Sequence, residues 1–83
     1  MTRIQKIVYA IPEDVFRDEV FRNLLLSDAF SALRCAGPKF LTEKEKQLLI
    51  SQFAEYCKVT PEEDELEEYA YAFTQREMRE FTC

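Results

Sequence analysis

Apolar side chains recur along the first part of the chain with the spacing of an amphipathic helix. Between residues 3 and 11 they occupy the i, i+3, i+4 and i+7 positions of one helical face, as Ile4, Ile7, Val8 and Ile11. A strand is the alternative for this segment, because IVYAI is short and rich in β-formers. Pro12 is expected to close the segment and to open a second helix, since proline suits the first helical turn.

The apolar pattern continues beyond Pro12 in four further segments. The first would present one face of large side chains, Phe16, Val20 and Leu24, with Phe21 and Leu25 beside it. Ser27 is expected to cap a short helix, DAFSALRCA, which Gly37-Pro38 ends. The clearest helix is EKEKQLLISQFAEYC, whose apolar stripe comprises Leu49, Phe53, Tyr56 and Cys57. A last helix is expected from Thr60-Pro61 to about Arg79.

Start signals precede three of these segments. A threonine is followed three residues later by Glu or Gln in three pairs: Thr2 with Gln5, Thr42 with Glu45, and Thr60 with Glu63. In this spacing each side chain can accept a hydrogen bond from the other residue's backbone N–H at a helix start. The pattern predicts an all-α fold, a compact bundle or orthogonal array of four to five helices with a long acidic C-terminal helix. The alternative is an α+β fold with a short N-terminal strand.

Length and composition place the chain among small globular proteins. Its 83 residues suffice for one helical domain, which we assign to residues 1–83. The residues are 47% apolar and 33% charged, which is typical of a folded chain. No run of about 18 apolar residues is present to span a membrane, and the start MTRIQKIVYAIPEDVF lacks the small-residue cleavage site of a secretory signal. We expect a soluble, cytoplasmic protein without a membrane partner.

The chain lacks the residues on which most catalysis depends. It contains no histidine, the commonest general base, and its single glycine cannot form a phosphate-cradling loop. Cys57 lies on an apolar stripe with no activating base beside it. The three cysteines are odd in number and form no C-x-x-C pair, so neither a disulfide framework nor a zinc site is expected. We expect a non-enzymatic protein without catalytic residues, metal or cofactor.

Acidic residues are concentrated in the stretch TPEEDELEEYAYAF at residues 60–73. From Thr60 onward the chain carries eight acidic and two basic side chains, a net charge of −6, whereas residues 1–59 carry eight acidic and nine basic ones. Three interpretations compete for this stretch: a calcium site, an imitation of nucleic-acid phosphates, and the solvated start of a helix.

The solvated helix start is the favoured interpretation. A calcium loop needs acids at alternating positions and a glycine to turn the chain, and Pro61 with the helical pattern argues against one. Duplex DNA carries about one charge per 1.7 Å of its axis, whereas a net charge of −6 over a helix of about 30 Å gives roughly one charge per 5 Å. This charge density is too low for a faithful imitation of duplex DNA. Four apolar residues share one side of this helix, namely Leu66, Tyr69, Ala70 and Phe73. Most of the acidic residues lie on its other sides.

A second apolar stripe on the same helix goes beyond this interpretation. Tyr71, Met78 and Phe81 cluster on another side, while Glu77 falls back on the side of the core. A helix with two apolar stripes packs against two bodies, so the second is either the N-terminal segment or another molecule. Met and aromatic side chains suit a partner surface, and nearby acids favour a basic partner. The expected protein-binding residues are Glu62, Glu65, Glu68, Tyr71, Met78 and Phe81.

The favoured function is that of a small acidic protein-binding module. An adaptor, a regulator or an inhibitor of a larger host protein would each fit, and this size and charge are common among phage-encoded inhibitors. The first alternative is a homo-oligomeric structural or assembly protein such as a homodimer, and the second is a nucleic-acid mimic that inhibits a DNA- or RNA-binding protein. Direct nucleic-acid binding is disfavoured, because phosphates would repel a helix that begins PEEDELEE.

Overall fold

The computed structural model describes the backbone of residues 1–81 and the side chains of residues 1–79. Within this part the chain forms six α-helices, two short 3-10 turns and no strand. The elements are α1 (Arg3–Tyr9), α2 (Glu13–Phe16), α3 (Glu19–Leu25), α4 (Asp28–Ala36), η1 (Pro38–Phe40), α5 (Glu43–Cys57), η2 (Glu63–Glu65) and α6 (Leu66–Phe81). The predicted all-α class is therefore confirmed, and the alternative of a strand near the N-terminus is wrong.

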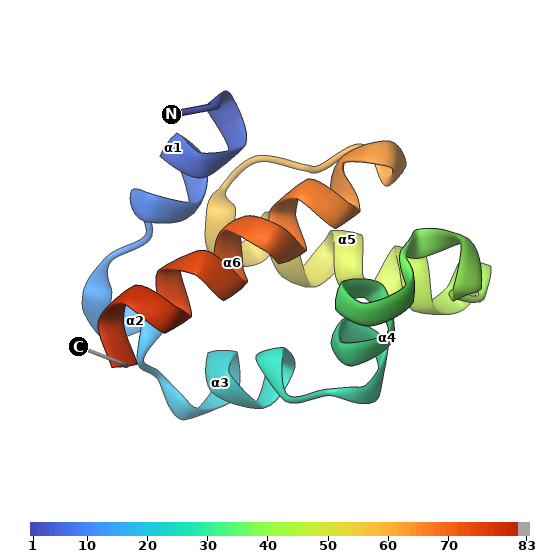
Figure 1. Cartoon of the computed structure of the whole chain (residues 1–83), viewed down its shortest axis with the longest axis horizontal. Helices are drawn as coiled ribbons and strands as arrows, with labels where there is room; N and C mark the ends of the chain where they lie inside the picture. The colour runs from blue at the N-terminus through green and yellow to red at the C-terminus, as the bar shows by residue number, and fades with distance from the viewer. Residues whose placement is uncertain (82–83) are drawn as a thin grey trace.

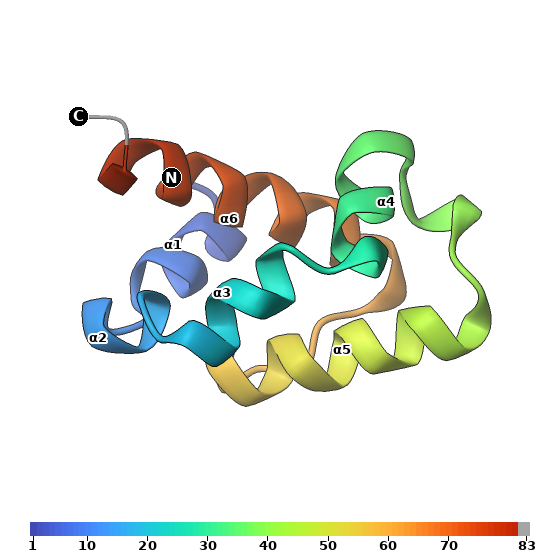
Figure 2. The ribbon, with the colours of Figure 1, turned by 90° about the horizontal axis from the view of Figure 1, so that it is seen from below.

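The last helix, α6, is the central element of the fold. It crosses the whole molecule, with α1 along one side and α4 near its beginning (Figure 1), and these two helices make its most extensive contacts. Helix α5 lies on the opposite side of the molecule from α6, and α3 is seen between the two (Figure 2). The molecule measures 33 × 23 × 20 Å along its principal axes.

The core is a cluster of aromatic rings gathered around Phe73 of α6. The Phe73 ring centroid lies 5.1 Å from that of Phe53 in α5, 5.4 Å from that of Phe21 in α3, and 6.3 Å from that of Phe30 in α4. All four side chains are fully buried. Such tilted and edge-on pairs stabilise a core beyond the apolar area they bury, so one residue of α6 connects three other helices.

The expected helix after Pro12 is broken into two, which raises the number of helices to six. Helix α2 ends at Phe16, and the side chain of Asp18 accepts a hydrogen bond from the Val20 N–H at 3.0 Å, capping α3. The break changes the helical phase, so Phe16 and Phe21 are both buried while Val20 is 66% exposed. The expectation that Val20 shares the buried face with Phe16 is therefore wrong.

Two of the three predicted threonine caps are confirmed. Thr2 with Gln5 and Thr42 with Glu45 each form the reciprocal pair of hydrogen bonds, at 2.9 and 3.1 Å. Thr60 does not start a helix, because η2 begins only at Glu63.

At the start of η2, the Glu62 N–H donates to Glu65 Oε1 at 3.0 Å. Helix α6 follows from Leu66 to Phe81. The left-handed backbone at Lys58, with φ of 61°, ends α5. Ser27 caps α4 as expected, accepting from the Phe30 N–H at 3.2 Å.

No helix within residues 1–81 combines the length and the apolar character that crossing a membrane requires.

Candidate functional site

Helix α6 buries the side that the sequence predicts. Leu66, Tyr69, Ala70 and Phe73 are all buried, and Ala72 joins them. Glu77, expected on the core side, is only partly buried and reaches Arg22 of α3 at 3.8 Å between Oε2 and Nη2. A carboxylate is tolerated near the core there because a cation on the neighbouring helix faces it.

A buried arginine gives α6 a second packed side that the sequence pattern missed. Arg76 is 4% exposed, and its Nη1 donates to the carbonyl oxygens of Val8 and Ile11, both at 2.8 Å. Its guanidinium carbon lies 4.2 Å from the centroid of the Phe16 ring. The apolar pattern does not mark Arg76 as a buried residue, because a charged residue is rarely buried without a partner.

Two features of the sequence agree with this burial. Arg76 continues the i, i+3, i+7 line of Tyr69 and Ala72, and the last carbonyls of a short helix such as α1 attract a cation. The N-terminal segment therefore packs on the Ala72 and Arg76 side of α6.

The two described members of the second apolar stripe of α6, Tyr71 and Met78, are largely exposed. Their exposed fractions are 60% for Tyr71 and 58% for Met78. The side chain of Phe81, the third predicted member, lies outside the described residues. Gln75 Nε2 donates to the Tyr71 hydroxyl at 2.8 Å, which holds the ring along the helix surface.

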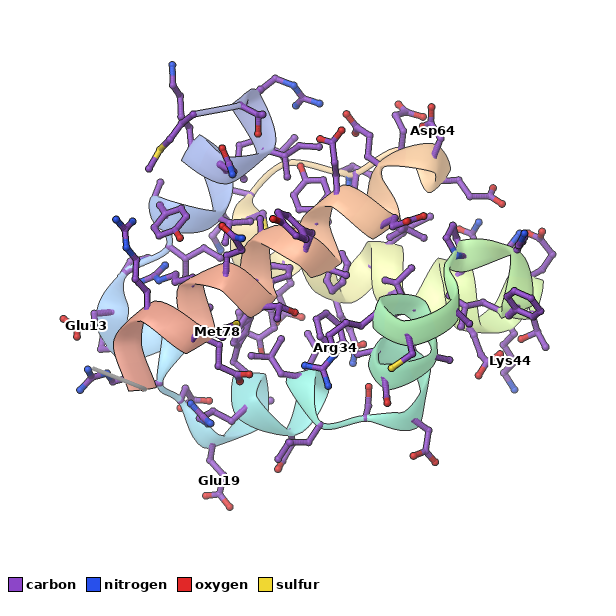
Figure 3. All side chains as sticks on the ribbon, viewed as in Figure 1. Glu13, Glu19, Arg34, Lys44, Asp64 and Met78 are labelled. Carbon is purple, nitrogen blue, oxygen red and sulfur yellow. The ribbon has the colours of Figure 1, made fainter. Side chains whose placement is uncertain are left out.

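Tyr71 lines a surface groove between α4 and α6. The groove has a volume of about 470 Å³. Its lining comprises Arg34 from α4 together with Asp64, Glu67, Glu68, Ala70, Tyr71 and Thr74 from η2 and α6. Arg34 lies between α4 and α6, and Asp64 lies just before the first turn of α6 (Figure 3). Three carboxylates and one guanidinium give the lining a net charge of −2, next to an aromatic ring.

The predicted acidic residues divide between this groove and the fold. Glu68 lines the groove. Glu65 instead forms an ion pair with Arg3 of α1 and accepts the Glu62 N–H, so these two residues support the start of α6. Glu63 is likewise engaged, 2.7 Å from the Nζ of Lys46.

Asp64 and Glu67 line the groove although the sequence pattern did not single them out. Among the side chains described, Asp64, Glu67 and Glu68 make no ion pair. Lys46 also contacts Glu43 at 3.1 Å, and the two carboxylates raise the pKa of Lys46 above its usual value.

Within residues 1–79, no three Asp, Glu or Cys side chains converge in an arrangement that could hold a metal ion. Burial raises the pKa of the Cys57 thiol to about 11, which keeps it protonated and unreactive at neutral pH. The chain matches no protein-family model, no curated protein and no solved structure.

Proposed function

We propose that the chain is a small, non-enzymatic protein-binding module whose α4–α6 groove receives a basic segment of a partner protein. The observation that carries the proposal is the presence of three carboxylates without an ion-pair partner, among residues 1–79, around a groove of about 470 Å³ beside the exposed Tyr71. A groove of this size lies within the range that proteins use to hold a ligand group.

The chemistry of the lining favours an Arg or Lys side chain. The apolar stem of such a residue would lie along the exposed Tyr71 ring, and its charged end would meet Glu67 and Glu68. Arginine is the better fit, because its planar guanidinium can donate two parallel hydrogen bonds to a carboxylate. Arg34 on the opposite wall would hold a backbone carbonyl or an acidic neighbour of the bound residue.

This arrangement suits an adaptor, a regulator or an inhibitor of a larger protein, and it requires no cofactor. A nucleic-acid mimic is less well supported, because Glu63 and Glu65 are neutralised by Lys46 and Arg3. The acids that remain form a local patch rather than an extended row of charges.

Titration with short peptides tests the proposal. Fluorescence anisotropy would compare an Arg-rich peptide with an acidic peptide of the same length, and NMR amide shifts would map the bound site. We expect binding of the basic peptide alone, with shifts concentrated at Arg34 and at residues 67–74. Affinity should fall as salt rises, because exposed charges carry the attraction.

A matched pair of variants separates the groove from general charge attraction. The double variant Glu67→Lys and Glu68→Lys should lose the peptide, whereas Glu13→Lys with Glu19→Lys, the same charge change at the other end of the molecule, should keep it. Equal loss in both variants, or shifts spread over every acidic residue, would show non-specific attraction and refute the proposal.

A further inference from the structure

A second hollow, independent of the α4–α6 groove, lies between α3 and α5. It has a volume of about 380 Å³ and shares no lining residue with the groove on α6. Its apolar lining includes Val20 and Leu24 from α3 and Leu48 and Tyr56 from α5. Val20 and Leu48 are 66% and 53% exposed. Helix α5 lies on the opposite side of the molecule from α6 (Figure 2), so the two surfaces can be occupied together.

The outward face of α5 carries a charge pattern that is complementary to itself. Lys44, Leu48, Ser51 and Glu55 are all exposed and follow the i, i+4, i+7, i+11 spacing of one helical line. Lys44 and Glu55 stand at opposite ends of this line, about 16 Å apart at the helical rise per residue. Neither forms an ion pair among the side chains of residues 1–79, although the chain pairs Arg17 with Glu13 and Lys46 with Glu43 nearby.

A two-fold axis beside the middle of this line would satisfy both charges at once. If two α5 helices pack antiparallel with the axis between Leu49 and Ile50, Lys44 of each copy faces Glu55 of the other. Leu48 of each copy then lies opposite Ser51 of the other, and the small serine leaves room for the leucine at the rim of the apolar hollow. Contacts of this kind, with one patch meeting itself, define the symmetric interfaces of homodimers.

We propose that a second copy of this chain docks on the α3–α5 face, with the two α5 helices antiparallel. A helix of 15 residues offers a contact about 22 Å long and about 10 Å wide. This footprint is smaller than the roughly 800 Å² per partner of a standard stable interface. The dimer is therefore weak and concentration-dependent, with a dissociation constant on the order of 10 to 100 µM. Both α4–α6 grooves remain open in it, which gives the dimer two binding sites.

Sedimentation of the reduced protein from about 5 to about 500 µM tests this proposal over the expected range of dissociation constants. The mass should rise from 9.9 kDa toward twice that value, and high salt should lower it. Leu48→Glu places two like charges beside the axis and should leave a monomer at every concentration. Because Leu48 is exposed, this variant should keep the circular dichroism spectrum of the wild type.

Charge exchange tests the register and the antiparallel orientation. Lys44→Glu alone and Glu55→Lys alone should each weaken the dimer at least tenfold, because two pairs of like charges then face each other. The double variant Lys44→Glu with Glu55→Lys should restore the wild-type dissociation constant. Three results would each overturn the proposal: a monomer at about 500 µM, a dimer that persists in Leu48→Glu, or a double variant that does not restore dimerisation. A dimer that persists in Leu48→Glu would place self-association on another surface, with Met78 of α6 the next residue to change.

Discussion

Replacing Arg76 with methionine removes the polar connection between the last helix and the first while keeping much of the side-chain volume. The guanidinium donates two hydrogen bonds of 2.8 Å to Val8 and Ile11 and lies over the Phe16 ring. Each hydrogen bond from a charged donor contributes about 1.5 to 3 kcal/mol. Because the variant no longer buries a charge, its folded state avoids the desolvation penalty of the guanidinium, which offsets part of the lost hydrogen-bond energy. We therefore expect the free energy of unfolding to fall by about 3 kcal/mol.

Thermal unfolding followed by circular dichroism would measure this loss. For a domain of this size, 3 kcal/mol corresponds to a fall in Tm of roughly 12 to 24 °C, out of a total stability on the order of 4 to 12 kcal/mol. Arg79→Met is the matched control, since Arg79 is exposed and only approaches the Tyr9 ring at 5.8 Å. An Arg76→Met variant that loses less than about 1 kcal/mol, or no more than Arg79→Met, would refute the reasoning that this arginine fastens α1 to α6.

Two further predictions concern the caps and the buried thiol. Thr42→Ala should lower the free energy of unfolding, measured in urea, by about 1 kcal/mol, since Thr42 and Glu45 cap α5. Thr60→Ala should change this free energy by less than about 0.5 kcal/mol. Equal losses in the two variants would contradict the assignment of the caps. The pKa of Cys57 is raised from 9.0 to about 11 in the folded protein, so the unfolded chain releases the thiol proton at lower pH than the folded one. The stability that the protonated thiol contributes is therefore complete below pH 9 and should be lost as the pH rises toward 11. In Cys57→Ala the decline over this window should be smaller, and an identical decline in both proteins would assign it to other groups.

The helical segments were predictable because their signals are local. Capping pairs and apolar stripes lie within one or two turns of each other, and they located α1, α4, α5 and the buried side of α6. The break at Arg17 and Asp18 was not predictable from the stripe, because Phe16, Val20 and Leu24 also fit one continuous helix. There the Asp18 cap and the burial of both Phe16 and Phe21 outweigh the local periodicity.

The candidate site was harder to predict, because its parts come together only in three dimensions. The groove needs Arg34 from α4 beside Glu67 and Glu68, more than 30 residues later in the chain. The ion pair of Arg3 with Glu65 connects residues 62 positions apart, and nothing in the acidic run marks Glu65 as the one that is engaged. Tyr71 and Met78 were correctly placed away from the core stripe, since helical phase alone determines that.

The position of Phe73 in the chain has a consequence for synthesis. A ribosome adds about 5 to 20 residues per second from the N-terminus, and the helix that carries Phe73 is made after every helix that packs on it. Until then the rings of Phe21, Phe30 and Phe53 lack the residue that joins them. The cluster around Phe73 therefore cannot be completed until α6 has been synthesised and packs against α3, α4 and α5.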